Sequence, residues 1–193
     1  MKYLLAFLLI FPAVIFAGEL KDLKIGDTVP SFTLKNYDGK EVDLKKVMKE
    51  NKYTVVMFIS TECPVSNGYN ERMESLHETF GKKGIAFLGV NANKAEDVKR
   101  IAEHSKEHGF KFPVLKDEQN KVADLYNAQV TPETFLISPE GKLLYHGRID
   151  DSRNLAKVTS NDLANALTML LAGKTVTQTT PKAFGCSIKR IQS

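Results

Sequence analysis

Residues 53–66 read YTVVMFISTECPVS, and this stretch decides the fold class. The nearly continuous apolar run from Tyr53 to Ile59 is typical of a strand that is buried on both faces of a sheet. Pro64 suits the first turn of a helix, because a helix leaves the N–H of that position without an internal partner. The stretch therefore predicts a buried strand that leads through Cys63 into a helix.

The segments on either side of this stretch alternate between strands and helices. A β-hairpin is predicted around Asp38-Gly39, because apolar and polar residues alternate over residues 30–44. The apolar spacing predicts further strands at 84–90, 112–115, 133–137 and 143–148, and helices at 69–80, 95–108, 122–126 and 161–171. Helices that alternate with buried strands predict an α/β domain of three layers.

The two ends of the chain differ in composition from its middle. Residues 1–17 combine a basic start, an apolar run and a small residue at the end, which is the layout of a cleaved signal peptide. The run is too short for a permanent membrane anchor. We therefore expect an exported protein, periplasmic or extracellular, with a domain at 18–173 and a tail at 174–193 that carries Cys186.

The charge and the histidines exclude several classes of function. The 193 residues include 27 basic and 23 acidic side chains, scattered along the chain, so no nucleic-acid partner is predicted. His104 and His108 have a spacing that metal ligands use, but we expect them on a solvated, charged helix face. His77 and His146 show no partner in sequence. Without a glycine-rich phosphate loop or a metal-ligand cluster, no cofactor is predicted.

Cys63 is the strongest candidate for a reactive group. At the start of a helix, unpaired N–H groups and the helix dipole stabilise a thiolate and lower the pKa of the thiol. The neighbours Glu62 and Ser66 are polar, which argues against an inert core cysteine. The chain is long enough to fold without a cross-link, so a redox role is favoured over a purely structural disulfide.

Short motifs spread over residues 24–190 match those of one known family. They are GDTVPSFTL at 26–34, DGK at 38–40, CPV at 63–65, TP at 131–132, GRIDD at 147–151 and GCSIK at 185–189. In these motifs the chain resembles the redoxin (AhpC/TSA) branch of the thioredoxin-like superfamily, and especially its peroxiredoxin-like group. The resemblance implies a thioredoxin-like three-layer fold with an N-terminal β-hairpin extension and an inserted helix. It also implies that the Thr131–Pro132 bond is cis and lies against Cys63.

The chain departs from this family at positions that carry chemistry. Thioredoxins have Cys-x-x-Cys, and Ser66 replaces the second cysteine here. Peroxiredoxins have a proline where this chain has Val56, and an arginine where it has Pro132. The buried acid of thioredoxins falls on Met57. These departures favour a thiol–disulfide centre, with its pocket shaped by Ser66 and the Thr131–Pro132 segment, over a peroxidase.

Proton transfer and the second thiol are less well defined by the sequence. Glu133 and Glu62 are candidates for a general acid or base, although we expect both to face solvent. The tail is long enough, at up to about 45 Å from Gly173, for Cys186 to reach Cys63. Cys186 can resolve an oxidised Cys63, pair with another chain or remain a free thiol, and the sequence leaves these alternatives open.

The leading hypothesis is an exported thiol–disulfide oxidoreductase in which Cys63 attacks a disulfide and Cys186 releases the product. Its partners would be a protein or small-molecule disulfide or a peroxide as substrate, and a thiol as electron donor. One alternative is a thiol-dependent peroxidase, in which peroxide oxidises Cys63 to a sulfenic acid. Another is a non-catalytic binding module of the thioredoxin fold, in which the disulfide is structural.

Overall fold

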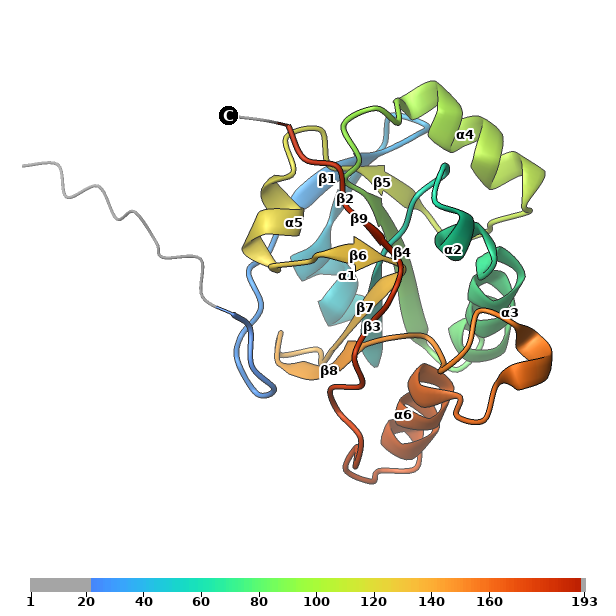
Figure 1. Ribbon diagram of the computed structural model, residues 1–193. Helices are drawn as coiled ribbons and strands as arrows, with labels where there is room; N and C mark the ends of the chain where they lie inside the picture. The colour runs from blue at the N-terminus through green and yellow to red at the C-terminus, as the bar shows by residue number, and fades with distance from the viewer. Residues whose placement is uncertain (1–21, 192–193) are drawn as a thin grey trace, which may run out of the picture.

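The computed structural model describes residues 22–191 (Figure 1). The predicted signal peptide at 1–17 lies outside the described residues, and so do residues 192–193. The boundaries of the domain and the tail therefore stay predictions. Within residues 22–191, no helix is long and apolar enough to cross a membrane.

A seven-stranded sheet forms the middle layer, in the order β2-β1-β5-β4-β3-β7-β8. Strand β3 (Tyr53–Phe58) runs parallel to β4 (Ile85–Asn91) on one side and antiparallel to β7 (Glu133–Ile137) on the other. After Tyr53 every residue of β3 is buried, which confirms the prediction from the apolar run. The remaining strands of this sheet are β1 (Thr33–Asn36), β2 (Glu41–Asp43), β5 (Val114–Lys116) and β8 (Leu143–Gly147).

Helices cover both faces of the sheet, so the three predicted layers are present (Figure 1). Side chains of a strand alternate between its faces, and accordingly Val55 and Met57 join one core while Val56 and Phe58 join the other. The first core packs against α3, α4 and α6, and the second against α1 and α5. The helices are α1 (Leu44–Glu50), α2 (Pro64–Asn67), α3 (Asn70–Gly81), α4 (Val98–Glu107), α5 (Lys121–Leu125) and α6 (Asp162–Leu171), with a 3-10 turn at Leu155–Lys157.

The predicted N-terminal hairpin is present and extends the sheet. Strands β1 and β2 pair antiparallel, and β1 continues the sheet by pairing with β5. The turn needs Gly39, whose φ of +84° favours a residue without a Cβ. Helix α1 was not predicted from the sequence. It follows β2 directly, and the carboxylate of Asp43 caps it by accepting a hydrogen bond from the N–H of Lys45 at 2.8 Å.

Residues 174–191 pack along the domain, and we call them the C-terminal strap. Val176 is buried in the core beneath α6. The N–H of His146 in β8 donates to the carbonyl of Thr179 at 2.9 Å. The strap then passes the end of β8, forms β9 (Cys186–Ser187) and continues to Ile191.

Strand β9 pairs antiparallel with β6 (Val130–Thr131), and Figure 1 shows the two strands side by side in front of the main sheet. The backbones approach closely just before Cys186. A Cβ added to Gly185 would lie 1.9 Å from the carbonyl oxygen of Thr131, far inside van der Waals contact. Only glycine fits there without displacing one of the two strands.

Replacing Gly185 with alanine should therefore loosen the strap. We expect Gly185→Ala to lower the free energy of unfolding by about 1–3 kcal/mol, as other overpacked sites do. Urea denaturation of the oxidised protein measures this change. Gly81→Ala is the matched control, because a Cβ at Gly81 meets no atom closer than 3.4 Å. Equal stability of Gly185→Ala and the unmodified protein would contradict the close pairing of β9 with β6.

Candidate active site around Cys63

Cys63 lies between the end of β3 and the first turn of α2. It is the N-cap residue of α2, and its sulfur accepts a hydrogen bond from the N–H of Ser66 at 3.3 Å. Pro64 occupies the start of the helix, as predicted. Because α2 ends after one turn, at Asn67, this local hydrogen bond stabilises negative charge on the sulfur more directly than the dipole of a long helix.

Cys63 forms a disulfide with Cys186, and their Cα atoms are 5.9 Å apart. Of the alternatives that the sequence left open, pairing within one chain is confirmed. The two sulfurs differ in their surroundings. Cys63 is only 4% exposed, whereas Cys186 is half-buried and is followed by the exposed Ser187.

The segment that precedes β7 lies against the disulfide. The Thr131–Pro132 peptide bond is cis, as the resemblance implies. The carbonyl oxygen of Thr131 is 3.4 Å from the sulfur of Cys63, and Thr131 also faces Cys186 in the β6–β9 ladder. The hydroxyl of Thr131 is buried and has no hydrogen-bond partner among the described residues.

Two serine hydroxyls hold the turn between β3 and α2. The hydroxyl of Ser60 accepts a hydrogen bond from the N–H of Cys63 at 2.9 Å. Ser66 is fully buried, and its hydroxyl accepts one from the N–H of Ser60 at 3.1 Å. The structure therefore places Ser66 beside Cys63, where its hydroxyl supports the turn from inside.

Glu96 is a buried carboxylate beneath this turn, and the sequence analysis missed it. It is 2% exposed and accepts four hydrogen bonds. The donors are the Ser60 hydroxyl (2.6 Å), the Thr61 N–H (2.6 Å), the Thr61 hydroxyl (2.8 Å) and the Asn91 amide (2.6 Å). Such a set of donors offsets the cost of burying a carboxylate. No sequence signal marks Glu96, because an acid in a charged segment is expected to be exposed.

Glu133 does not face solvent as expected, since it is only 5% exposed. Its carboxylate accepts hydrogen bonds from the N–H groups of Gln129 and Val130, at 2.7 and 3.1 Å. It also lies 2.6 Å from Nε2 of His146, a residue without an evident partner in the sequence. These contacts hold the backbone that leads into β6, and none of them reaches a cysteine. Glu62 is exposed, as expected.

His104 is buried, so its predicted place on a solvated helix face is wrong. Its Nε2 lies 2.9 Å from Oδ1 of Asn67 and 3.2 Å from Nδ2 of Asn70. These contacts join α4 to α2, the helix that Cys63 caps, and to the start of α3. Burial, together with the nearby positive charges of His108 and Arg100, lowers the pKa of His104 to about 4.

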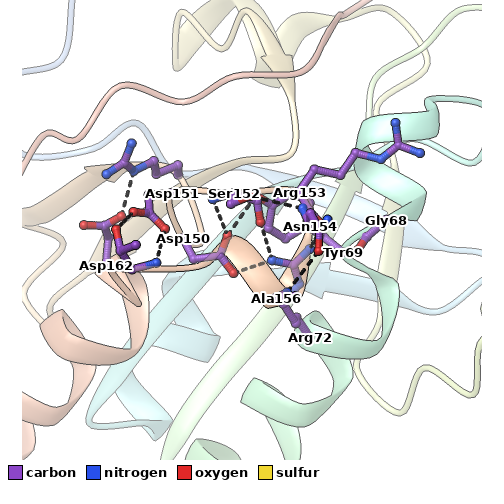
Figure 2. Close-up of polar contacts among 12 residues, drawn as sticks. Gly68, Tyr69, Arg72, Asp150, Asp151, Ser152, Arg153, Asn154, Ala156 and Asp162 are labelled. Atoms are coloured by element: carbon purple, nitrogen blue, oxygen red, sulfur yellow. Dashed lines mark hydrogen bonds and ion pairs between the residues drawn. The ribbon is translucent and has the colours of Figure 1, made fainter.

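A second polar network packs against the junction of α2 and α3 (Figure 2). The carboxylate of Asp150 accepts hydrogen bonds from the hydroxyl of Tyr69 at 2.9 Å and from the guanidinium of Arg72 at 2.5 Å. Arg72 also donates to the carbonyls of Gly68 and Arg153, at 3.0 and 2.6 Å. Burial and the Asp150 hydrogen bond raise the pKa of Tyr69 above its usual value. The GRIDD motif, through Asp150, thus ties the loop after β8 to the end of the active-site helix.

A groove formed by residues of β1 and α5 contains neither cysteine. Within residues 22–191, no three metal-ligating side chains gather at one point.

Residues 25–146 match the family model described as the AhpC/TSA family. The chain belongs to this family. A curated relative, the thiol-disulfide oxidoreductase ResA of Bacillus subtilis (strain 168), is 30% identical over 132 residues, which cover 67% of this chain and 70% of ResA. Membership of this family and the relationship to ResA make the protein a thiol-based oxidoreductase.

Solved structures similar to this chain identify its fold. An uncharacterized conserved protein from Geobacillus kaustophilus superposes with a TM-score of 0.83 at 34% identity, covering 89% of this chain and 94% of that one. The thioredoxin domain of a thiol-disulfide oxidoreductase from Bacteroides vulgatus superposes with a TM-score of 0.58 at 20% identity, covering 65% of this chain and 89% of that one. The predicted thioredoxin-like fold is therefore confirmed.

The burial of His104 predicts how stability depends on pH. Its pKa is depressed from 6.5 to about 4 in the folded protein, so the unfolded chain binds the proton more readily between these values. Stability should therefore fall as the pH is lowered through this window, by about 2 kcal/mol more in the unmodified protein than in His104→Gln. Urea denaturation at pH 7 and pH 4 measures the difference. Lys106→Gln, at an exposed position of the same helix, should behave like the unmodified protein, because Lys106 is not among the groups that lower the pKa of His104.

An equal stability difference between His104→Gln and the unmodified protein at both pH values would contradict this account of His104.

Removing the buried carboxylate of Glu96 should destabilise the turn that carries Cys63. We expect Glu96→Ala to lower the free energy of unfolding by about 2–4 kcal/mol, because four donors lose their acceptor. Glu96→Gln keeps one acceptor oxygen and should lose less. Urea denaturation compares both with Glu118→Ala, an exposed control that should change little. Equal losses for Glu96→Ala and Glu118→Ala would show that these hydrogen bonds do not support the turn.

Proposed function

We propose that this protein is an exported thiol–disulfide oxidoreductase whose redox centre is the Cys63–Cys186 pair. The observation that carries the proposal is the disulfide between the N-cap cysteine of α2 and a cysteine on the C-terminal strap. It joins the predicted nucleophile to a second thiol that can complete an exchange reaction. The relationship to ResA, a protein named for thiol–disulfide oxidoreduction, supports the same activity.

The reaction with a disulfide substrate takes place in two exchange steps. The thiolate of Cys63 attacks one sulfur of the substrate disulfide, and the other substrate sulfur leaves as a thiolate. Cys186 then attacks the sulfur of Cys63 in this mixed disulfide and releases the second substrate thiol. Two electrons pass from the cysteine pair to the substrate, and the Cys63–Cys186 disulfide forms.

The surroundings of Cys63 suit this chemistry. The N–H of Ser66 donates to the sulfur, which stabilises the thiolate as nucleophile and as leaving group. The carbonyl of Thr131, at 3.4 Å, can accept the S–H of the protonated form. Ser66 and the Thr131–Pro132 segment thereby shape the pocket around the sulfur. Glu133 acts as a positioning residue, because its carboxylate bonds to the backbone before β6 and not to a cysteine.

The proposed substrates are protein disulfides, and a thiol supplies the electrons. The half-buried position of Cys186 on β9, where a partner protein can reach it, supports a protein substrate. Export rests on the signal-peptide pattern of residues 1–17. A disulfide in this protein also agrees with an oxidising compartment, where such bonds persist.

A peroxidase is the second candidate, because the protein belongs to the AhpC/TSA family and Cys186 could resolve a sulfenic acid on Cys63. The contacts of Cys63 favour disulfide exchange. Among the described residues its sulfur lies within hydrogen-bonding distance of the N–H of Ser66 and the carbonyl of Thr131, and neither is cationic. Pro132 stands where peroxiredoxins carry their arginine.

The test measures reduction of insulin disulfides by the reduced protein, with a dithiol as electron donor. Cys63→Ser should lose activity by at least about 100-fold, because the nucleophile is gone. Cys186→Ser is the matched variant: it lacks the same disulfide but keeps Cys63, and it should accumulate a mixed disulfide on Cys63. Full activity of Cys63→Ser would contradict the proposal.

A peroxide experiment separates the two candidates. The reduced protein is mixed with one equivalent of hydrogen peroxide, and the loss of free thiols is followed over time. Disulfide exchange as the main activity predicts a rate close to that of an unactivated thiol. A rate more than about 100-fold higher would instead identify a peroxidase that uses Cys63.

A further inference from the structure

We propose that the electron donor attacks the sulfur of Cys186 in the oxidised protein and displaces Cys63 as the leaving thiolate. The inference rests on the proposed function and assigns one sulfur to each partner. The disulfide substrate reacts with Cys63 in the reduced protein, and the donor thiol reacts with Cys186 in the oxidised protein. Cys186 would thus be the point at which electrons enter.

The first argument is access to the two sulfurs. A thiolate must approach the attacked sulfur from the side opposite the sulfur that leaves. Cys63 is 4% exposed and is enclosed by the first turn of α2 and by Thr131, whose carbonyl oxygen is 3.4 Å from its sulfur. Cys186 is half-buried on the outer strand β9, next to the exposed Ser187. Solvent and a partner protein therefore reach Cys186 more readily.

The second argument concerns the leaving group, and it is independent of access. Exchange is faster when the departing sulfur is the better stabilised thiolate. The sulfur of Cys63 accepts the hydrogen bond from the N–H of Ser66 at 3.3 Å. No hydrogen bond to the sulfur of Cys186 is present among the described residues. Attack on Cys186 therefore leaves the negative charge on the sulfur of Cys63, where the hydrogen bond from the N–H of Ser66 stabilises it.

The strap keeps this arrangement in place on both sides of Cys186. Gly185 lies directly against the carbonyl of Thr131, where no side chain fits. Ile188 is 5% exposed in the core, and its N–H donates to the carbonyl of Gln129 at 3.0 Å. The N–H of Lys189 donates to the side chain of Asn93 at 2.8 Å. The oxidised protein therefore shields Cys63 while it presents Cys186.

The donor reaction balances in two steps. The donor thiolate attacks Cys186, forms a mixed disulfide with it, and breaks the Cys63–Cys186 bond, so that Cys63 leaves as a thiolate. A second donor thiolate then attacks the donor sulfur of the mixed disulfide and releases the Cys186 thiolate. Two donor thiols are oxidised to one disulfide, and both cysteines of the protein are reduced.

The experiment uses the oxidised protein without mutation, and reduced glutathione as the probe. Samples are quenched with acid at short times, free thiols are blocked with N-ethylmaleimide, and tryptic peptides are quantified by mass spectrometry. The two cysteines separate cleanly, since Cys63 falls in the peptide 53–72 and Cys186 in the peptide 183–189. Extrapolation to zero time removes later exchange between the two sulfurs.

We expect glutathione on the Cys186 peptide in about tenfold excess over the Cys63 peptide, with N-ethylmaleimide on Cys63. Equal amounts, or an excess on Cys63, would overturn the inference and leave the proposed function intact. A disulfide that resists both glutathione and dithiothreitol in the folded protein would contradict the proposed function itself.

A pair of variants tests whether the strap causes the selectivity. Ile188→Ala removes the buried anchor of the strap and should raise the share of glutathione on Cys63 by at least about threefold. Ile191→Ala is the matched control, because Ile191 is 52% exposed, and it should leave the distribution unchanged. An unchanged distribution in Ile188→Ala, with the variant folded by circular dichroism, would contradict shielding by the strap.

Discussion

The carboxylate of Glu96 fixes the turn from which Cys63 projects, and the rest of the site is arranged around that turn. Glu96 accepts hydrogen bonds from Ser60 and Thr61, which lie in the backbone segment between β3 and α2. The Ser60 hydroxyl donates to Glu96 and also accepts a hydrogen bond from the N–H of Cys63, so it positions Cys63 as well. Cys63 is thereby held as the cap of α2, at a distance from which its sulfur meets both the strap and the cis segment. The carboxylate acts on the cysteine only through this backbone.

The two thiols of the redox pair lie far apart in the sequence. In a Cys-x-x-Cys site the second thiol lies in the same helical turn, whereas here Ser66 takes that position and the partner is 123 residues away. A cross-link over so long a loop restricts the unfolded chain strongly, by about 5 kcal/mol in the chain-entropy description. Oxidation, which removes two electrons from the cysteine pair, should therefore also stabilise the docked strap. Redox state and the covering of Cys63 are coupled for this reason.

Burial explains where the sequence analysis succeeded and where it failed for the fold. The apolar run of β3 identified the centre of the sheet, because a strand buried on both faces must be apolar along its length. The N-terminal hairpin was also predicted correctly, from its Asp38-Gly39 turn and from the alternation of apolar and polar residues on either side. Helix α1 was missed because its seven residues carry only Leu44 and Met48 into the core, too few to show a helical period. The strap was missed because polar side chains dominate it while its backbone makes the contacts.

What the sequence by itself determined is the place of Cys63, between a buried strand and the first turn of a helix. Neighbouring residues in the sequence are enough to predict a buried strand that is followed by Cys63-Pro64 and a helix. Only the tertiary structure decided the rest of the site, because each remaining contact joins distant segments: Glu96 to the Ser60 turn, His104 to α2, and Cys186 to Cys63. Acids and histidines in charged stretches are exposed by default, and whether one is buried depends on donors that the fold brings to it from elsewhere in the chain.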